Sequence, residues 1–257
     1  MYHCKLPMDR AIRVALIGAG GNGAQMAAGI AQISVALQAR GGLPLVVYIY
    51  DDDRVSHANV GRQLFSPADV GRFKSDVIVE RTNWFYGFNW SSIPERVGKN
   101  SRLDQIDIFV TAVDTAKSRV DIEKAVFFNA YHTKYLLDVG NRTQSGQVVL
   151  GAYCNGVYEL PTLRLLFPEI NDENFNEQDQ GPSCSLAEAL QKQDLFVNRD
   201  VTTGALHILW DVISKRNIEV HGAFTSLETM RRSPLKVDRQ TWLRMNPNIE
   251  EFLTPAA

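Results

Sequence analysis

Residues 51–74 carry a concentration of side chains whose chemistry suits a nucleotide. Asp51 directly follows an apolar run, and an acid at the end of such a strand is typical of folds that hold ribose hydroxyls. Arg62, Gln63 and Lys74 supply N–H donors for phosphate oxygens, since arginine can fork across two oxygens and lysine acts as a point charge. The stretch therefore predicts contacts to a ribose at its start and to phosphate groups further along.

Two more acids could serve the same ligand. Asp53 points the same way as Asp51 if the chain stays extended, which would let it support a metal ion or orient Asn59; a purely structural role is the alternative. Asp52 should face away and be solvated. Asp114 ends another apolar run, at the edge where open α/β sheets bind ligands, although it could also cap the helix that follows.

A glycine-rich turn precedes this stretch. The apolar run Val14–Ile17 leads into Gly18, Gly20 and Gly23, and a helix is expected over 22–40. In such turns the first glycine permits the sharp bend, the second lets the backbone approach a phosphate, and the third lets helix and strand pack closely. The helix N-terminus adds unpaired N–H groups and a partial positive charge. The motif indicates a nucleotide without saying which one, and a plain glycine turn is the alternative.

Composition excludes several classes of protein. The chain has 257 residues, 45% hydrophobic and 22% charged, with a formal net charge of −2 and no cluster of basic residues. We therefore expect neither nucleic acid nor a membrane as a partner, and because no apolar run is long enough for a signal or a membrane span, we expect the cytoplasm. Cys4, Cys154 and Cys184 lie far apart without a C-x-x-C pair, so we expect neither a zinc site nor a disulfide framework.

Apolar runs and helical periodicity alternate along the first two thirds of the chain. Strands are expected at 14–17, 45–50, 90–97, 107–113, 135–139, 146–153 and 162–167. Helices are expected at 22–40, 73–85 and 116–129. Because alternating strands and helices imply a parallel sheet, we predict a Rossmann-like, doubly wound α/β fold. Its sheet should be mostly parallel, with later mixed strands and a C-terminal helical and hairpin extension.

The last third of the chain changes character. Residues 168–182 are polar and acidic, and a stretch of this kind without regular structure is usually functional. Helices are expected at 183–191 and 195–215, and a hairpin at 219–226 and 235–237. Trp242 and Phe252 should anchor the tail. Residues 1–12 are expected to be an irregular lead-in.

The spacing of the residues in 51–74 resembles a known pattern. The order D-x-D-x-V-x-x-x-N-x-x-R-Q followed by D-x-G-x-x-K is similar to that of the ThiF/MoeB and ubiquitin-activating enzyme superfamily, and residues 113–119 match its later aspartate motif. The resemblance covers roughly residues 10–215. Residues 182–198 also resemble the ThiF-family member of the PRTRC plasmid cassette. The resemblance implies one adenylation domain over 1–257, with a nucleotide-binding core (1–167), a crossover loop (168–182) and C-terminal helices and hairpin (183–257).

The resemblance also implies a ligand, ATP with Mg²⁺, and a role for each matching residue. Asp51 would accept hydrogen bonds from the ribose hydroxyls, and Asp114 would lie near Mg²⁺ and the α-phosphate. The residues that would line the triphosphate are Asn59, Arg62, Gln63 and Lys74. For Asn59 and Gln63, capping of a turn is the alternative.

The reaction implied is adenylation of the C-terminal glycine carboxylate of a small ubiquitin-like protein, by an enzyme that is a homodimer. A carboxylate is already a nucleophile, so catalysis would consist of positioning and of charge neutralisation, with Arg62, Lys74 and Asp114 as its agents. One alternative is a non-catalytic nucleotide-binding scaffold of a plasmid-associated system. A nicotinamide dehydrogenase is disfavoured because it would leave Arg62 and Lys74 unexplained, and an RNA-modifying relative is disfavoured by the absence of a basic patch.

Cys184 is the candidate for a second catalytic step. It opens an expected helix, where the N-terminus lowers a thiol pKa, and many relatives carry a cysteine in this region that forms a thioester or takes part in sulfur transfer. A buried or incidental cysteine is the alternative. Cys154 is expected in the core.

The sequence departs from the resembling family in two ways. Many relatives carry two C-x-x-C zinc pairs, which this chain lacks. Relatives also have a longer N-terminal helix whose arginine reaches the partner subunit's ATP site, and here Arg10 is the candidate substitute.

Overall fold

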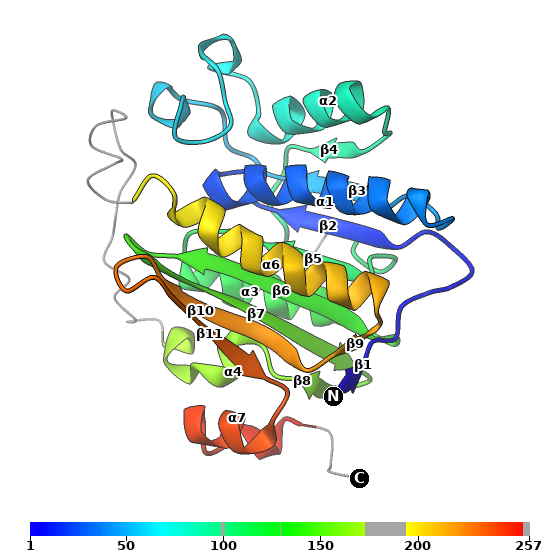
Figure 1. Ribbon diagram of the computed structural model, residues 1–257, viewed down its shortest axis with the longest axis vertical. Coiled ribbons are helices and arrows are strands. Elements are labelled where there is room, and N and C mark those ends of the chain that lie inside the picture. Colours follow the sequence, from blue (N-terminus) through cyan, green and yellow to red (C-terminus); the bar gives the residue numbers. More distant parts are fainter. Residues whose placement is uncertain (99–100, 129, 173–193, 254–257) are drawn as a thin grey trace.

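A nine-stranded mixed sheet runs through the protein in the part that the computed structural model describes, residues 1–98, 101–128, 130–172 and 194–253 (Figure 1). Its strand order is β11-β10-β7-β6-β5-β2-β3-β4, with β8 paired to β7. The predictions for residues 173–193, which include Cys184, the helix at 183–191 and most of the acidic segment, lie outside the described residues. No helix among the described residues is long and apolar enough to cross a membrane.

Five parallel strands form one half of the sheet. They are β2 (Arg13–Ile17), β3 (Val46–Tyr50), β4 (Ser91–Ile93), β5 (Ile108–Thr111) and β6 (Lys134–Asn141). The central strands are continuous apolar runs because both faces of the sheet are covered, and Val14 and Ile108 are fully buried. The predicted doubly wound α/β fold is confirmed.

Four long helices cover the two faces. They are α1 (Gly21–Ala39), α2 (Lys74–Tyr86), α3 (Ala116–Phe127) and α6 (Val197–Ser214). The connections through α1 and α2 step in one direction along the sheet, and the connection through α3 steps in the other. Right-handed crossovers therefore place α3 on the face opposite to α1, and Figure 1 shows α1 and α6 in front of the sheet and α3 behind it.

The other half of the sheet is antiparallel. It contains β7 (Ser145–Cys154), β8 (Val157–Leu160) and the hairpin β10 (Val220–Ser226) and β11 (Arg231–Lys236), so the predicted hairpin is confirmed. The predicted strand at 162–167 is wrong, because a turn after β7 lets β8 pair back and the next residues form the short helix α4 (Leu163–Leu166). A short apolar run is compatible with either element, and its burial does not distinguish them.

The two ends of the chain pack onto this body. Residues 1–12 are not wholly irregular, because β1 (Tyr2–His3) pairs with β9 (Asn217–Ile218). In the tail, α7 (Arg239–Met245) buries Trp242, as predicted. The prediction for Phe252 is wrong: its side chain is 41% exposed, and Ile249 and Leu253 are buried instead. Single-turn 3-10 helices complete the described chain at His57–Asn59, Pro67–Asp69, Pro168–Asn171 and Ile249–Glu251.

The parallel strands end together at one edge of the sheet. We call it the carboxyl edge; its strand ends are Ile17, Tyr50, Thr111 and Asn141. The chain leaves β2 and β5 in opposite directions, and ligands of open α/β sheets bind at such a switch point. The opposite edge, where Arg13, Asp107 and Thr133 lie at or next to the starts of parallel strands, is the amino edge.

Candidate functional site

The glycine turn has the geometry that its sequence predicts. Gly18 has φ +94°, a backbone conformation that favours glycine, and a Cβ there would lie 2.6 Å from the Ala112 carbonyl oxygen. A Cβ on Gly23 would lie 1.9 Å from the Gly18 carbonyl oxygen. A Cβ on Gly20, in contrast, would meet nothing within 4 Å. Gly18 and Gly23 therefore serve close packing, and the backbone at Gly20 borders open space that a ligand can enter.

The N-terminus of α1 lies at this turn. Gly20 is the residue that caps the helix, and because glycine has no side chain it makes no side-chain capping hydrogen bond there. The first N–H groups of a helix have no intrahelical partner and carry a partial positive charge. This N-terminus can therefore receive a phosphate group.

Asp51 is tied to the glycine turn. One of its carboxylate oxygens accepts a hydrogen bond from the Ala19 N–H, and the other accepts one from the Asp53 N–H at 2.8 Å. Burial raises the pKa of the Asp51 carboxyl above its ordinary value, although these two N–H groups and the nearby Lys74 ammonium oppose the shift. A carboxylate has about four acceptor positions, so Asp51 keeps acceptors for the hydroxyls of a ribose.

Lys74 is the first residue of α2, and its ammonium returns to the end of β3. Its Nζ lies 2.8 Å from an Asp53 carboxylate oxygen, and its backbone N–H donates to the Asp53 carbonyl at 2.9 Å. The Lys74 side chain is 10% exposed whereas that of Asp53 is 59% exposed. Asp53 thus balances the charge of a buried lysine. It does not orient Asn59 as expected, because Asn59 is held by contacts in its own loop.

Arg62 and Asp114 are brought together from distant parts of the chain. Arg62 is partly buried in the loop after β3, and burial lowers the pKa of its guanidinium while the nearby Asp114 carboxylate opposes the shift. Asp114 is exposed just beyond β5. Next to Arg62, Gln63 is buried, and its side-chain carbonyl oxygen has no hydrogen-bond partner among the described residues. A buried amide left in this way favours a ligand or water nearby.

For Asn59 and Asp114 the sequence left two roles open, and the local contacts of each residue bear on that choice. The Asn59 side-chain oxygen accepts hydrogen bonds from the backbone N–H of Ser56 at 2.9 Å and from its hydroxyl at 3.1 Å, so Asn59 closes a turn of its own loop. Asp114 is not the cap of α3, because the Thr115 hydroxyl accepts the hydrogen bond from the Ser118 N–H. Asp52 is exposed and forms an ion pair with Arg96, so it faces away from the site.

The two cysteines that the structure describes differ in exposure. Cys4 is buried, and burial raises the pKa of its thiol to about 12. Cys154 was expected in the core and is instead partly exposed at the end of β7. Among the described residues no three His, Cys, Asp or Glu side chains are close enough to hold a metal ion by themselves. Mg²⁺ is usually held by one or two carboxylates together with substrate phosphates, so an ion that arrives with a nucleotide does not require a cluster of this kind.

Arg10 does not serve the candidate site of its own subunit. Its guanidinium donates two hydrogen bonds of 2.7 Å to the Asp107 carboxylate, at the amino edge. An open hollow of about 470 Å³ lies there, lined by residues that include Arg10, His132 and Cys154. Arg10 therefore lies at the edge opposite to the candidate site of its own subunit, and its reach to a partner subunit's ATP site stays a prediction.

A pair of asparagines at the carboxyl edge escaped the sequence analysis. Asn22, inside the glycine motif, donates from its amide nitrogen to the side-chain oxygen of Asn141 at 2.7 Å. Asn141 ends β6, which the chain reaches more than a hundred residues later. The position of Asn22 between Gly20 and Gly23 was the one available signal, and nothing in the sequence linked it to Asn141.

Comparisons with known proteins bear on this geometry. The ThiF family profile matches residues 9–241. A comparison with curated proteins gives no match. Among solved structures, the selenomethionine form of PaaA is similar with a TM-score of 0.59 and 16% sequence identity, covering 88% of this chain and 73% of that one.

Two structures of MccB from E. coli are also similar. The form with succinimide has a TM-score of 0.59 and 15% identity, and the other form has a TM-score of 0.60 and 14% identity. Each alignment covers 88% of this chain, but this chain spans only 63% and 62% of the MccB chains. At such identities the likeness to PaaA and MccB concerns the fold alone.

Proposed function

This chain belongs to the ThiF family, and we propose that it uses ATP to adenylate a carboxylate at the carboxyl edge of its sheet. Membership in the family supports adenylation chemistry of the ubiquitin-activating enzyme superfamily and an enzymatic role. The nucleotide site, its residue roles and the acyl substrate are our proposal.

One observation carries the proposal. Five positions along the chain bring complementary groups to the ends of β2, β3 and β5: the N-terminus of α1 at Gly20, a carboxylate at Asp51, an ammonium at Lys74, and the Arg62 guanidinium beside the Asp114 carboxylate. An acid for ribose hydroxyls, with helix N–H groups and cations for phosphates, is the donor and acceptor set that a nucleoside triphosphate requires.

The residues present fit Mg²⁺-bound ATP. The open space at Gly20 leaves room for a ligand. The buried side-chain oxygen of Gln63, next to Arg62 in the sequence, has no hydrogen-bond partner among the described residues. Asp114 would hold Mg²⁺, which when bound supplies neutralisation of phosphate charge. Asp51 would bind the ribose, and Arg62 and Lys74 would stabilise charge that develops as pyrophosphate leaves.

We propose the C-terminal glycine carboxylate of a small ubiquitin-like protein as the acyl substrate. A carboxylate needs no general base, and no described histidine lies among the candidate residues except His57, which is exposed on its own turn. The protein's work would be to hold the carboxylate in line with the α-phosphate. A homodimer, transfer to Cys184 and a place in a PRTRC-type plasmid system belong to the same proposal.

The test is ATP–pyrophosphate exchange with a panel of small ubiquitin-like proteins, each compared with the same protein lacking its C-terminal glycine. Exchange that needs the terminal glycine supports the proposal. Asp51→Asn should lower the exchange at least tenfold, whereas Asp52→Asn, which changes the neighbouring exposed acid in the same way, should leave it within twofold. ATP binding without exchange under any condition would favour a nucleotide-binding scaffold.

A further inference from the structure

Arg119 connects the middle of the sheet to the loop that carries Asp114. It extends from α3, and its guanidinium forms an ion pair with Asp138 of β6. Another nitrogen of the same guanidinium donates to the Val113 carbonyl at 2.5 Å. Val113 immediately precedes Asp114, so this hydrogen bond from Arg119 holds the backbone next to the candidate magnesium ligand.

Asp138 is itself fixed on two sides. Its second carboxylate oxygen accepts a hydrogen bond of 3.0 Å from the Thr111 hydroxyl, at the end of β5. The strand β6 also leaves room for the arginine, because a Cβ on Gly140 would lie 2.7 Å from a guanidinium nitrogen. Thr111, Asp138 and Arg119 thus form a chain of contacts that begins and ends on the segment leading to Asp114.

The arrangement is buried. The side chains of Arg119 and Asp138 are 12% and 7% exposed. An ion pair taken out of water is weak evidence for stability, because the desolvation of both charges offsets their attraction. A geometric role explains this ion pair better, because the planar guanidinium of Arg119 can hold a carboxylate and a carbonyl at fixed positions at the same time.

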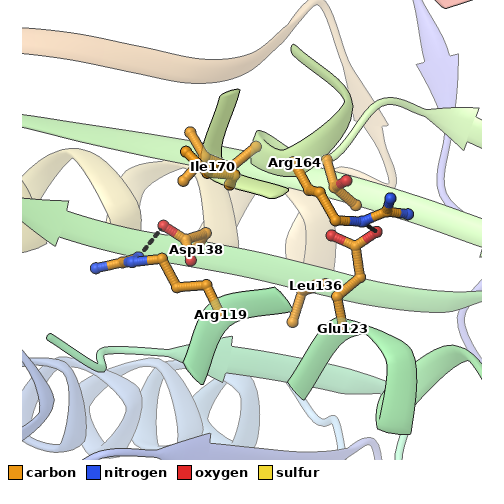
Figure 2. Close-up of a pocket in the computed structure, with 8 residues that line it drawn as sticks. Arg119, Glu123, Leu136, Asp138, Arg164 and Ile170 are labelled. Atoms are coloured by element: carbon orange, nitrogen blue, oxygen red, sulfur yellow. Dashed lines mark hydrogen bonds and ion pairs between the residues drawn. The ribbon is translucent and has the colours of Figure 1, made fainter. Parts of the chain in front are cut away.

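A second ion pair provides an internal comparison. Figure 2 shows both pairs at one narrow pocket, with Arg119 and Asp138 on one side and Arg164 and Glu123 on the other. Arg164 donates to Glu123 at 2.9 Å, and their side chains are 22% and 4% exposed. Arg164 also donates to the Tyr158 hydroxyl at 2.8 Å, and neither Glu123 nor Tyr158 belongs to the candidate nucleotide site. The two pairs have similar burial and share α3, yet only one reaches the Asp114 loop.

We propose that Arg119 is a positioning residue for nucleotide and Mg²⁺ binding, acting through the Val113 carbonyl on Asp114. This inference rests on the proposed function and adds a residue to it. By holding the Asp114 loop, Arg119 sets the Asp114 carboxylate against Arg62 before the ligand arrives. A lysine at this position has one nitrogen and cannot contact the Asp138 carboxylate and the Val113 carbonyl with the same fixed fork.

The experiment measures the dissociation constant of ATP by calorimetry at several Mg²⁺ concentrations, with the full chain. Arg119→Lys should raise that constant at least fivefold and shift its Mg²⁺ dependence to higher concentration. Thr111→Val, which removes only one hydroxyl, should give a smaller change in the same direction. Arg164→Lys is the matched control: it should lower the melting temperature to a similar degree while leaving ATP and Mg²⁺ binding within twofold of wild type.

A double mutant with Asp114 distinguishes a positioning role of Arg119 from a general contribution to stability. If Arg119 acts through Asp114, then Arg119→Lys added to Asp114→Asn should weaken binding less than twofold further. Additive effects, or an Arg119→Lys protein that binds like wild type, overturn the inference while wild-type ATP binding leaves the proposed function standing. A wild-type protein that does not bind ATP with Mg²⁺ overturns both.

Discussion

The two edges of the sheet carry the same kinds of side chain and use them differently. At the amino edge, the Asp107 carboxylate accepts two hydrogen bonds from Arg10 at 2.7 Å and one from the Arg13 N–H at 2.9 Å. At the carboxyl edge, Asp114 is exposed, and the buried side-chain oxygen of Gln63 has no described partner. Both edges therefore contain paired charges, since Lys74 is paired with Asp53 at the carboxyl edge, but the carboxyl edge adds an exposed carboxylate and a buried oxygen with no described partner, both of which a ligand could use.

The hollow at the amino edge is lined by charged groups that already have protein partners. The amino edge has a hollow of about 470 Å³, but its Lys5 and Arg10 are paired with Glu159 and Asp107. The carboxyl edge is marked by backbone geometry instead, in particular by the open space at Gly20. Our proposal of a site at the carboxyl edge therefore rests on its polar groups and its backbone geometry and not on the size of a cavity.

The largest expected effect is at Asp114. Asp114→Asn removes a charge from the exposed end of β5 and should reduce adenylation about 100- to 1000-fold, the usual cost of losing one electrostatic contact at a reacting centre. The free energy of unfolding should change by less than about 0.5 kcal/mol, because the side chain is exposed. Pyrophosphate exchange and chemical denaturation measure the two quantities, and a large loss of stability would assign Asp114 to the fold.

A buried histidine in the antiparallel half should affect stability alone. His221 accepts a hydrogen bond from the Trp242 indole at 2.9 Å and lies 2.9 Å from the Leu150 carbonyl, and burial lowers its pKa to about 4 from 6.5. Because the folded state binds the proton less readily than the unfolded state, this stabilisation is complete above pH 6.5 and is lost as the pH falls toward 4. Wild type should lose about 3 kcal/mol more than His221→Gln across this range.

Denaturant unfolding at pH 7, 5.5 and 4 checks this prediction. Equal pH dependence in the two proteins would show that His221 is not the responsible group. Nucleotide affinity at pH 7 should be the same in both, since His221 packs between β7 and α7 and not at the carboxyl edge.

Breaking the ion pair at the amino edge should have the opposite effect to Asp114→Asn: the protein should lose stability and keep its ATP affinity. Arg10→Ala leaves the buried Asp107 without its main partner and should cost about 1–3 kcal/mol, less than for a fully buried pair because the Arg10 side chain is 38% exposed. For a chain of this size, each kcal/mol corresponds to about 2–4 °C in melting temperature. ATP affinity should not change, and a tenfold loss of affinity would contradict the division between the edges.

The smallest expected effects are those of substitutions at Gly20 and Gly23, two glycines of the same turn. Gly20→Ala adds a methyl group into open space, so folding should be preserved while ATP affinity falls about tenfold because the methyl group occupies the place of a phosphate. Gly23→Ala places the methyl group against the Gly18 carbonyl and should lower stability first. Melting temperatures with and without ATP–Mg²⁺ distinguish the two variants, and equal behaviour would contradict the assigned roles.

Sequence reasoning worked where local pattern determines structure. The apolar runs at β2 and β5 were predicted because a continuous apolar run suits a strand that is covered on both faces. The hairpin of β10 and β11 was also predicted, although β11 starts at Arg231, before the predicted 235–237. The run at 162–167 was mistaken for a strand because its apolar residues fit a short helix equally well. Phe252 was mistaken for an anchor because residue type alone does not show which side of a turn is buried.

Residues of the candidate site could be proposed from the sequence, but the contacts between distant segments could not. Spacing indicated Asp51, Arg62 and Lys74, and the structure brings their segments to one edge. The contact of Arg119 with Val113 and Asp138, and that of Asn22 with Asn141, depend on how distant segments cross, and no local pattern records such crossings. The ion pair of Arg10 with Asp107 was not predicted for the same reason, since the two residues are almost a hundred positions apart.

The most direct test of the account is the melting temperature of the wild-type chain with ATP–Mg²⁺ and, separately, with NAD⁺. A ligand at a hundred times its dissociation constant adds about 2.7 kcal/mol, or about 5–10 °C at this chain length. We predict a rise of this order with ATP–Mg²⁺, its loss in Lys74→Ala, and no rise with NAD⁺. A rise with NAD⁺ alone, or with neither nucleotide, would contradict an ATP site at the carboxyl edge.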